Sequence, residues 1–305
     1  CMRACNENKK TYIGFTLTEM LTALAVIAVL LALLIPALSM VQKKAMVVKQ
    51  RAQFHAIEVG LEAFRSDWGD YPPSEYNMTK YGNGSVASFR LAEALIGGDG
   101  FGFHPNSVFY QDYLFDQNGD GTFSAAETVY HAATDLAWET AAQNRAARKG
   151  PYLELETANA VKLQDIYGAN TGSLSGTMFV LADAFSKKMR ATGKEVGMPI
   201  LYYRANVSQI GMDPVRANWG TNTYNLNDSY AAGSGIISLT VPFQSSKTTH
   251  DLNEDAADDG INWFYRVIAN PNFTSPPRPY RANSFLLQSA GPDGLYGTAD
   301  DLFNF

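Results

Sequence analysis

Cysteine is scarce in this chain: the 305 residues include only Cys1 and Cys5, both at the N-terminal end. Two cysteines so close together cannot cross-link distant parts of a fold, and no cysteine and histidine spacing typical of a zinc site is present. The four histidines are scattered, and the sequence contains no HExxH, GxSxG, P-loop or GxGxxG signature. The common enzyme signatures are therefore absent, and we expect no catalysis.

A surplus of basic residues is also lacking. The chain has 24 Lys and Arg against 30 Asp and Glu, a net charge of −6. This balance cannot neutralise a phosphate backbone, so we expect no dedicated nucleic-acid binding. The 25 glycines and 13 prolines are close to average use, which argues against a low-complexity chain. The length suffices for one large or two ordinary domains.

A charge-free run is the strongest feature of the first forty residues. No charged residue occurs from Met20 to Val41, after a polar segment that carries Arg3, Lys9 and Lys10. As one helix this run extends about 33 Å, enough for a hydrocarbon core of about 30 Å. A secretory signal has a shorter apolar core of about 7–15 residues, so we predict a membrane span.

Two residues interrupt this apolar segment. Glu19 lies near its start, where a carboxylate complements the helix dipole by about 0.3–1 kcal/mol. Pro36 lies near its end, where a proline kink is tolerated in membrane helices. A carboxylate inside a span is otherwise rare, which makes Glu19 a candidate functional residue.

The string GFTLTEML, Gly14 to Leu21, resembles the processing site of type IV prepilins and type II secretion pseudopilins. In that family a peptidase cuts after the glycine, and the new N-terminal residue, here Phe15, is methylated. Counted from Phe15, Glu19 is the fifth residue, the family's glutamate position, and Pro36 is the twenty-second, where the family often has a helix-bending proline. The resemblance implies residues 1–14 as a leader peptide.

The new amine of Phe15 lies one helical turn from the Glu19 carboxylate, so the two can pair within one chain. In a filament of packed helices, Glu19 can instead meet the amine of a neighbouring subunit. That pairing would favour extraction of a subunit from the bilayer only when it is docked in register, because an unpaired charge in lipid costs several kcal/mol.

The resemblance also implies a function and partners. We expect a structural subunit of a type II secretion pseudopilus or a type IV pilus-like filament. The implied partners are identical or homologous subunits, a prepilin peptidase, an inner-membrane assembly platform and the lipid bilayer. The implied location is the inner (cytoplasmic) membrane, as a single-pass protein with its C-terminal domain outside the cytoplasm, and a periplasmic or cell-surface filament after assembly. Basic residues flank both ends of the span, so charge alone gives no orientation.

Two alternatives stay open. An adhesin or a DNA-uptake subunit could share the same N-terminus, and an exposed variable domain would favour it. A membrane-anchored, calcium-dependent extracytoplasmic enzyme is less favoured, and a deep pocket with converging polar groups in residues 74–282 would support it.

Beyond the span, apolar residues follow helical spacing at Phe54, Ile57, Leu61, Phe64 and Trp68. The sequence GDYPP at 69–73 then ends the helix. We expect an N-terminal helix at 15–68, with a membrane span at 15–41 and an amphipathic stalk at 42–68.

The remainder, 69–305, is predicted as a globular domain. Candidate helices are 87–96, 124–146 and 176–190, and candidate strands are 199–206, 235–243, 261–269 and 283–289. Late strands after early helices predict an α+β, pilin-like fold, with an antiparallel sheet packed on the long helix.

Residues 116–127 (DQNGDGTFSAAE) match the twelve-residue EF-hand calcium loop, with Gly121 at the turn position. The predicted ligands are Asp116, Asn118, Asp120, Thr122 through its carbonyl, Ser124 and Glu127. The alternative is a polar loop in which Ser124 and Glu127 form a capping box at a helix start. Since only one such loop is present, we expect a structural calcium ion in an inserted loop instead of a paired switch.

A second acidic loop, SAGPDGLYGTADD at 289–301, resembles the C-terminal calcium-binding loop of major pseudopilins. The resemblance implies Asp293, Asp300 and Asp301 as side-chain ligands. The alternative is a Pro-Asp-Gly turn with solvated acids.

Overall fold

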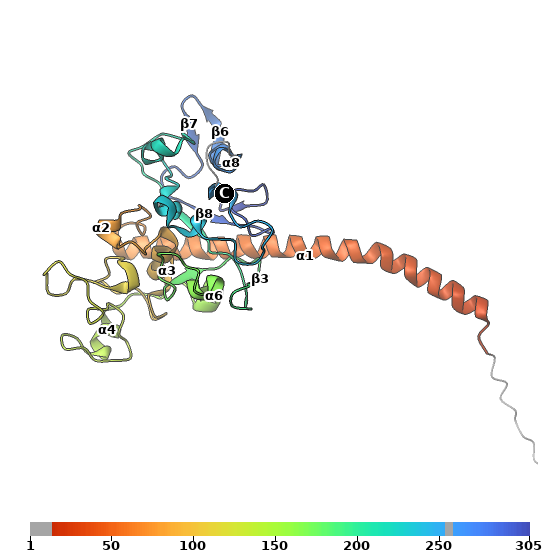
Figure 1. Cartoon of the computed structure of the whole chain (residues 1–305), viewed down its shortest axis with the longest axis horizontal. Helices are drawn as coiled ribbons and strands as arrows, with labels where there is room; N and C mark the ends of the chain where they lie inside the picture. Colours follow the sequence, from red (N-terminus) through yellow and green to blue (C-terminus); the bar gives the residue numbers. More distant parts are fainter. Residues whose placement is uncertain (1–13, 254–258) are drawn as a thin grey trace, which may run out of the picture. The chain divides into compact units, whose positions relative to one another are not determined.

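A long helix and a compact domain make up the computed structural model, which describes residues 14–253 and 259–305 (Figure 1). The chain divides into two compact units, one ending at Ala45 and one formed by Met46–Phe305, and the boundary falls within helix α1 (Leu17–Trp68). Gly69 with φ +86° follows its last residue, and the prolines at 72–73 prevent continuation, so the helix ends where the sequence predicts.

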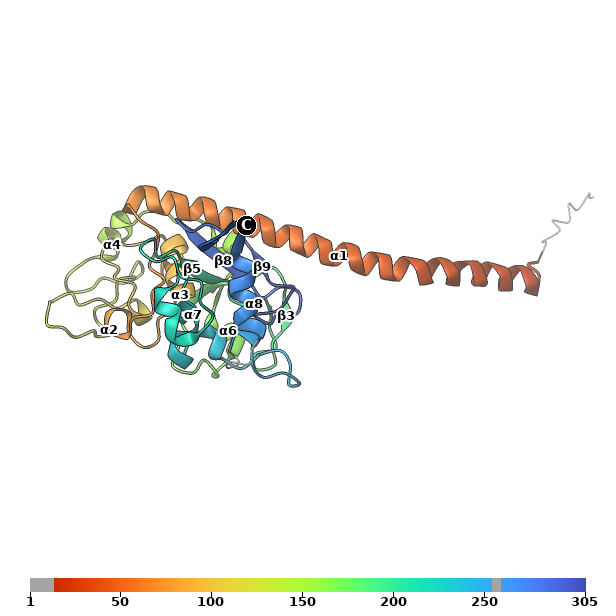
Figure 2. The same ribbon diagram turned by 90° about the horizontal axis from the view of Figure 1, so that it is seen from above.

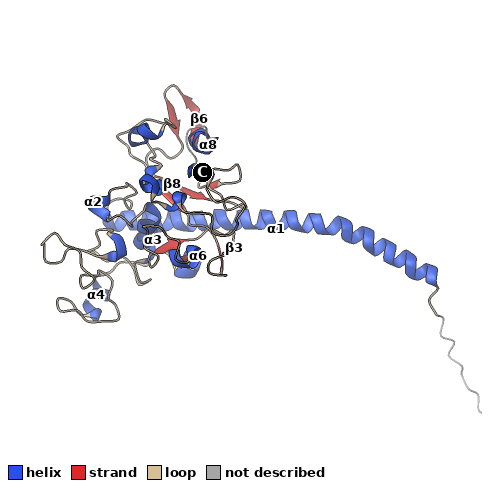
Figure 3. Cartoon of the chain, viewed as in Figure 1, coloured by secondary structure: helices blue, strands red, loops and turns tan. Residues whose placement is uncertain are grey.

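The second unit contains short elements joined by long loops (Figure 3). Its helices are α2 (Met78–Tyr81), α3 (Ala87–Ile96), α4 (Ala141–Ala147), α5 (Leu155–Ala158), α6 (Leu163–Tyr167), α7 (Asn227–Tyr230) and α8 (Asp259–Ile268), with 3₁₀ turns η1 (Gln111–Tyr113), η2 (Arg216–Thr221), η3 (Ala231–Gly233), η4 (Ile236–Ser238) and η5 (Asp251–Asn253). Its strands are β1 (Ala160–Lys162), β2 (Phe179–Leu181), β3 (Lys187–Lys188), β4 (Glu195–Val196), β5 (Leu201–Arg204), β6 (Ala269–Thr274), β7 (Pro277–Pro279), β8 (Phe285–Ser289) and β9 (Leu302–Phe303).

A three-stranded antiparallel sheet in the order β5-β8-β9 lies at the centre of this unit. Tyr202 pairs with Leu287, and Gln288 pairs with Phe303. The other strands form two-stranded antiparallel pairs, β1 with β2, β3 with β4 and β6 with β7. The mixture of helices and small antiparallel sheets confirms the α+β class.

The C-terminal half of α1 is a core helix of this unit. Phe54, Ile57 and Leu61 are buried in one cluster with residues of α3, β5 and β8. Figure 2 shows β8 beside this part of α1. The apolar face predicted from spacing is therefore the face that packs on the sheet.

Four predicted elements are wrong. The 261–269 segment is helix α8, because its buried residues Ile261, Phe264, Tyr265 and Ile268 follow helical spacing, which outweighs their β propensity. In 124–146 only Ala141–Ala147 is helical, starting at a Thr140–Gln143 capping box. In 176–190, pairing of β2 with β1 replaces the predicted helix. The predicted strand 235–243 contains the 3₁₀ turn η4, with Ile236 and Ile237 buried.

Two glutamines attach α1 to the domain. Gln53 Nε2 donates to the carbonyls of Ala158 (3.0 Å) and Ala182 (2.8 Å), and Gln50 Oε1 accepts from the Ala184 amide at 2.7 Å. Both glutamines are buried, so their hydrogen bonds form away from water, where a lost partner leaves an unsatisfied group.

We expect Gln53→Ala to destabilise the Met46–Phe305 unit by about 1–3 kcal/mol, because the buried Ala158 carbonyl loses its side-chain donor, whereas the Ala182 carbonyl keeps a hydrogen bond from Asn159 Nδ2 at 2.9 Å. Urea unfolding of a 46–305 fragment measures this loss. Arg51→Ala, which changes an exposed neighbour on the same helix, is the matched control. Equal stability of the two variants would show that the glutamine contacts contribute little.

Candidate functional site

The predicted cleavage site lies just before helix α1. Gly14, Phe15 and Thr16 are non-helical, and the Phe15 side chain is 79% exposed. A Cβ added at Gly14 would meet no atom within 4 Å. Within the described residues, which begin at Gly14, no atom therefore crowds the Gly14 side of the peptide bond to Phe15. Residues 1–13, which include Cys1, Cys5 and the basic residues of the predicted leader, lie outside the described residues.

Glu19 forms a capping box with Thr16 at the start of α1. Its Oε2 accepts from the Thr16 amide at 2.8 Å and from the Thr16 hydroxyl at 2.7 Å, and the Glu19 amide lies 3.3 Å from that hydroxyl. This satisfies amides at the helix start that have no helical partner. The T-x-x-E spacing at 16–19 is the sequence signal for this cap, which our sequence interpretation missed.

The first part of α1 has an apolar, exposed surface. Among the described residues, α1 is the helix long and apolar enough to cross a membrane, by length and composition. Large apolar side chains such as Leu24, Leu30 and Leu33 are exposed along it. Pro36 lies inside the helix. The predicted span at 15–41 thus coincides with exposed apolar residues that lipid could cover.

The first acidic loop turns around the Asp116 carboxylate. Asp116 accepts from the amides of Gly119 (2.7 Å), Asp120 (3.1 Å) and Gly121 (2.8 Å). Gly121 has φ +81°, and Asn118 Oδ1 accepts from the Asp120 amide at 2.9 Å. Residues 116–121 therefore form a tight turn with exposed oxygen atoms, which fits the first half of a calcium loop.

Glu127 does not complete this arrangement. Its Oε2 accepts from the Ser124 hydroxyl at 3.0 Å and lies 3.3 Å from the Ser124 amide. These are capping-box contacts, although no helix follows Ser124. η1 precedes the loop, so the flanking helices of an EF-hand are absent from this described segment.

The second acidic loop holds Asp293, Asp300 and Asp301 close together. The Asp293 amide donates to Asp300 Oδ2 at 2.9 Å, and Thr298 donates to Asp300 Oδ1 at 2.5 Å. Asp301 is nearly buried, and its Oδ2 accepts from Gln288 Nε2 at 2.6 Å. Burial raises the pKa of Asp301 well above its usual value, and burial together with the neighbouring Asp300 charge raises the pKa of Asp293.

No group of three or more Asp, Glu, His or Cys side chains within residues 14–253 and 259–305 is arranged to hold a metal ion. Calcium also uses carbonyl, hydroxyl and water oxygens, so this finding concerns side-chain clusters alone. Ligation at either loop would need such oxygens beside the predicted carboxylates.

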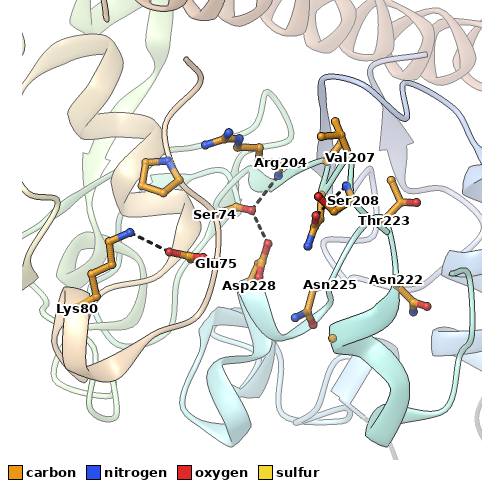
Figure 4. A pocket seen from close by; sticks show the side chains of 14 residues that line it. Ser74, Glu75, Lys80, Arg204, Val207, Ser208, Asn222, Thr223, Asn225 and Asp228 are labelled. Atoms are coloured by element: carbon orange, nitrogen blue, oxygen red, sulfur yellow. Dashed lines mark hydrogen bonds and ion pairs between the residues drawn. The ribbon is translucent and has the colours of Figure 1, made fainter. Parts of the chain in front are cut away.

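A polar pocket of about 400 Å³ lies between the segment after α1 and the β5–α7 region (Figure 4). Its charged side chains are paired within the protein. Lys80 pairs with Glu75 at 3.0 Å, and Ser74 donates to Asp228 while accepting from the Arg204 amide at 2.9 Å. Burial raises the pKa of Asp228 to about 7. Lys80, Glu75, Ser74 and one Asp228 oxygen thus have partners within the protein, whereas Asp228 Oδ1 is buried without a hydrogen-bond partner.

An apolar pocket of about 570 Å³ adjoins this one, since both are lined by Pro73, Lys80 and Arg204. Its other walls include Phe109, Phe115 and Phe123. Phe123 stacks on Tyr110 with ring centres 3.7 Å apart, so part of the aromatic surface is already covered. This pocket places the first acidic loop beside an aromatic surface.

A comparison with known protein families gives a match in the N-terminal part of the chain. Residues 9–35 match the family model described as the prokaryotic N-terminal methylation motif. No curated protein and no solved structure matches the chain. The match covers Gly14, Phe15 and Glu19, on which the sequence resemblance rested, whereas Pro36, the fourth residue of that resemblance, lies just beyond it. The chain therefore carries, over residues 9–35, a prokaryotic N-terminal methylation motif typical of type IV pilins and pseudopilins.

Proposed function

We propose that this chain is the precursor of a filament subunit of a type II secretion pseudopilus or type IV pilus-like assembly. In this proposal α1 anchors it in the inner membrane by one span, and a prepilin peptidase removes the segment before Phe15. The methylation motif at 9–35 carries the proposal. The uncrowded Gly14 side of the bond to Phe15 and the exposed apolar surface of α1 support it.

The proposed work of the protein is assembly. The apolar first part of α1 would pack against the same part of neighbouring subunits after leaving lipid, while the Met46–Phe305 unit stays outside the cytoplasm. The identical or homologous subunits, the peptidase and the membrane assembly platform are the proposed partners. The pairing of the charged groups in the polar pocket gives no support to an enzymatic alternative.

Processing tests this proposal directly. We expect co-expression with a prepilin peptidase to remove residues 1–14 and to add one methyl group to Phe15, both measured by intact-mass spectrometry. Gly14→Val should block the cut while leaving the chain otherwise unchanged, because a side chain at Gly14 meets no neighbour within 4 Å. A mature N-terminus near Met40 would instead identify an ordinary signal peptide and contradict the proposal.

We also propose that both acidic loops bind calcium as a structural ion. For 116–127, the turn around Asp116 and the exposed oxygens of Asn118 and Asp120 support binding. The Glu127 carboxylate accepts a hydrogen bond from Ser124, so it must give up this contact in order to bind the ion. For 289–301, the proximity of Asp293 and Asp300 supports binding, because a divalent cation offsets their repulsion.

A further inference from the structure

The walls of the polar pocket carry hydrogen-bonding groups that have no partner within the described residues (Figure 4). Asp228 is buried, and its Oδ1 atom lacks a donor, whereas its Oδ2 atom accepts from the Ser74 hydroxyl. The side-chain amide nitrogens of Asn206 and Asn225 and the hydroxyl of Ser208 also form no hydrogen bond within this part of the chain. A ligand in the pocket would therefore meet one free acceptor and three donors.

Contacts within the protein fix the orientation of both amides. Asn225 Oδ1 accepts from the Asn227 amide at 2.9 Å, and Asn206 Oδ1 accepts from the Ser208 amide at 3.1 Å. Since each oxygen serves a backbone amide, the nitrogen of each side chain is the group left to donate. The pocket thus presents a defined set of donors beside the free Asp228 oxygen.

The segment 73–75, which forms part of the wall, is held in place by Arg90. This fully buried guanidinium donates to the carbonyls of all three residues at 2.7–2.9 Å. Ser74 then links the segment to α7, through Asp228, and to β5, through the Arg204 amide at 2.9 Å. A site that is assembled before the ligand arrives loses less conformational entropy on binding.

The charges around the pocket are compensated within the protein. Lys80 pairs with Glu75 at 3.0 Å, and Arg204 pairs with Asp70. Burial raises the pKa of Asp228 to about 7, so this carboxyl carries less than a full charge near neutral pH. A phosphate or a charged peptide would find no free counter-charge among these residues, so a neutral ligand fits best.

The backbone along the pocket is already used. The amides of residues 204–206 donate to Ser74 Oγ and to the carbonyls of Ser284 and Thr223, at 2.8–2.9 Å. A peptide that binds by strand addition needs free backbone groups at a sheet edge. Recognition in this pocket therefore falls to the side chains, which favours a ligand rich in hydroxyl groups over a peptide.

The adjoining apolar pocket offers a second kind of contact. Phe109 and Phe123 line it and are half-buried, so part of each ring stays accessible. One face of a sugar ring consists of C–H groups and packs on aromatic rings, while the hydroxyl groups at its edge make hydrogen bonds. The two pockets measure about 400 and about 570 Å³, each within the range of about 300–1,000 Å³ for small-ligand sites.

We propose that the two pockets together bind a neutral oligosaccharide. One sugar unit occupies the polar pocket, where one hydroxyl group donates to Asp228 Oδ1 and a neighbouring hydroxyl accepts from Asn225 Nδ2. The next unit packs its C–H face on the phenyl rings of the apolar pocket. Sugar hydroxyls replace the hydrogen bonds of the water that they displace, so the polar groups stay satisfied when the ligand enters. This binding goes beyond filament assembly and does not depend on it.

Ligand-observed NMR on the full chain tests this inference. The chain is kept in amine-oxide detergent micelles, because a detergent with a sugar headgroup would compete for the site. The probes are maltotriose, cellotriose, mannotriose, galactotriose and the trimer of N-acetylglucosamine. At least one should show saturation transfer and bind with a Kd of about 1 mM or lower. Absence of binding for every probe at about 10 mM would overturn the inference.

Two further probes test the class of ligand. Inorganic phosphate and the neutral peptide acetyl-tetraalanine-amide should not displace the bound trisaccharide at about 10 mM. Displacement by the peptide would assign the pocket to peptides, and displacement by phosphate would assign it to anions. Either result would overturn the proposal of a neutral saccharide.

Three variants locate the binding. Asn225→Asp keeps the oxygen that accepts from the Asn227 amide but replaces the donor by a second acceptor, so Kd should rise about tenfold or more. Ser208→Ala removes an exposed hydroxyl that forms no hydrogen bond within the described residues, and Kd should rise about threefold. Asn227→Asp is the matched control, because Asn227 does not line the pocket, and Kd should stay within about twofold. Equal affinity of the wild type, Asn225→Asp and Ser208→Ala would place the saccharide elsewhere and overturn the inference.

Discussion

Glu19→Ala is expected to leave membrane insertion intact and to reduce incorporation into filaments by roughly tenfold or more, about 1.4 kcal/mol per subunit. Insertion should persist because alanine removes a charged group that is costly in lipid. Incorporation should fall because the proposed filament uses this carboxylate to pair with the Phe15 amine of a neighbour. Membrane fractionation and a competition assay against wild-type subunits measure the two effects separately.

Glu19 also has a second role, in the capping box of α1, and the experiment must separate this role from the pairing with a neighbouring subunit. In the single chain Glu19 binds the amide and hydroxyl of Thr16, so alanine also weakens the start of α1. Loss of a cap costs about 0.5–2 kcal/mol, similar to the expected assembly effect. A defect in Glu19→Ala alone therefore does not identify the lost interaction.

Glu19→Gln is the matched control, since glutamine is equally suited to the third helical position of a capping box but carries no charge. If the charge pair aligns the subunits in register, Glu19→Gln should reduce incorporation into filaments as severely as Glu19→Ala does. Normal incorporation of Glu19→Gln would show that the cap, and not the pairing with a neighbour's amine, is the requirement. Normal incorporation of both variants would remove Glu19 from the assembly mechanism.

The sequence predicted those parts of the fold that local patterns determine. The face of α1 that carries Phe54, Ile57 and Leu61 follows from 3.6-residue spacing, and β8 from its short run of apolar residues. The errors came where two patterns competed. In α8 the β-branched and aromatic residues suggested a strand, while the spacing of Ile261, Phe264 and Ile268 determined a helix.

The candidate sites show a similar division. The methylation motif is contiguous in sequence, so it was found from sequence alone. The ligand order at 116–127 was also visible, but the contact of Glu127 with Ser124 depends on the turn geometry that the chain adopts. The hydrogen bonds of Gln50 and Gln53 to residues 158–184 join segments more than a hundred residues apart, and no local sequence pattern predicts them.

Calcium is expected to stabilise the Met46–Phe305 unit mainly through the second acidic loop. This loop joins β8 to β9, two strands of the central sheet, and includes the nearly buried Asp301. Ion binding to the folded loop alone would stabilise it by about 2.7 kcal/mol at a hundredfold excess over Kd. The first loop lies within the loop-rich 97–148 segment, so its ion should order only that region.

We therefore expect Asp300→Ala to lower the Tm measured in calcium by about 5–10 °C, and Glu127→Ala to leave Tm within about 2 °C while loosening residues 110–140. Both carboxylates have hydrogen-bond partners within the chain, but Asp300 lies in the loop that joins β8 to β9, whereas Glu127 lies in the loop-rich 97–148 segment. Thermal unfolding of the 46–305 fragment with calcium or with chelator gives the comparison, and hydrogen exchange reports the local change. Asp300→Asn keeps the side-chain volume and tests the charge alone.

An unchanged wild-type Tm on chelation would refute a stabilising ion at the second loop, and unchanged exchange at 110–140 would refute one at the first. A larger Tm loss from Glu127→Ala than from Asp300→Ala would reverse their order, because it would place the stabilising ion in the loop that lies outside the central sheet.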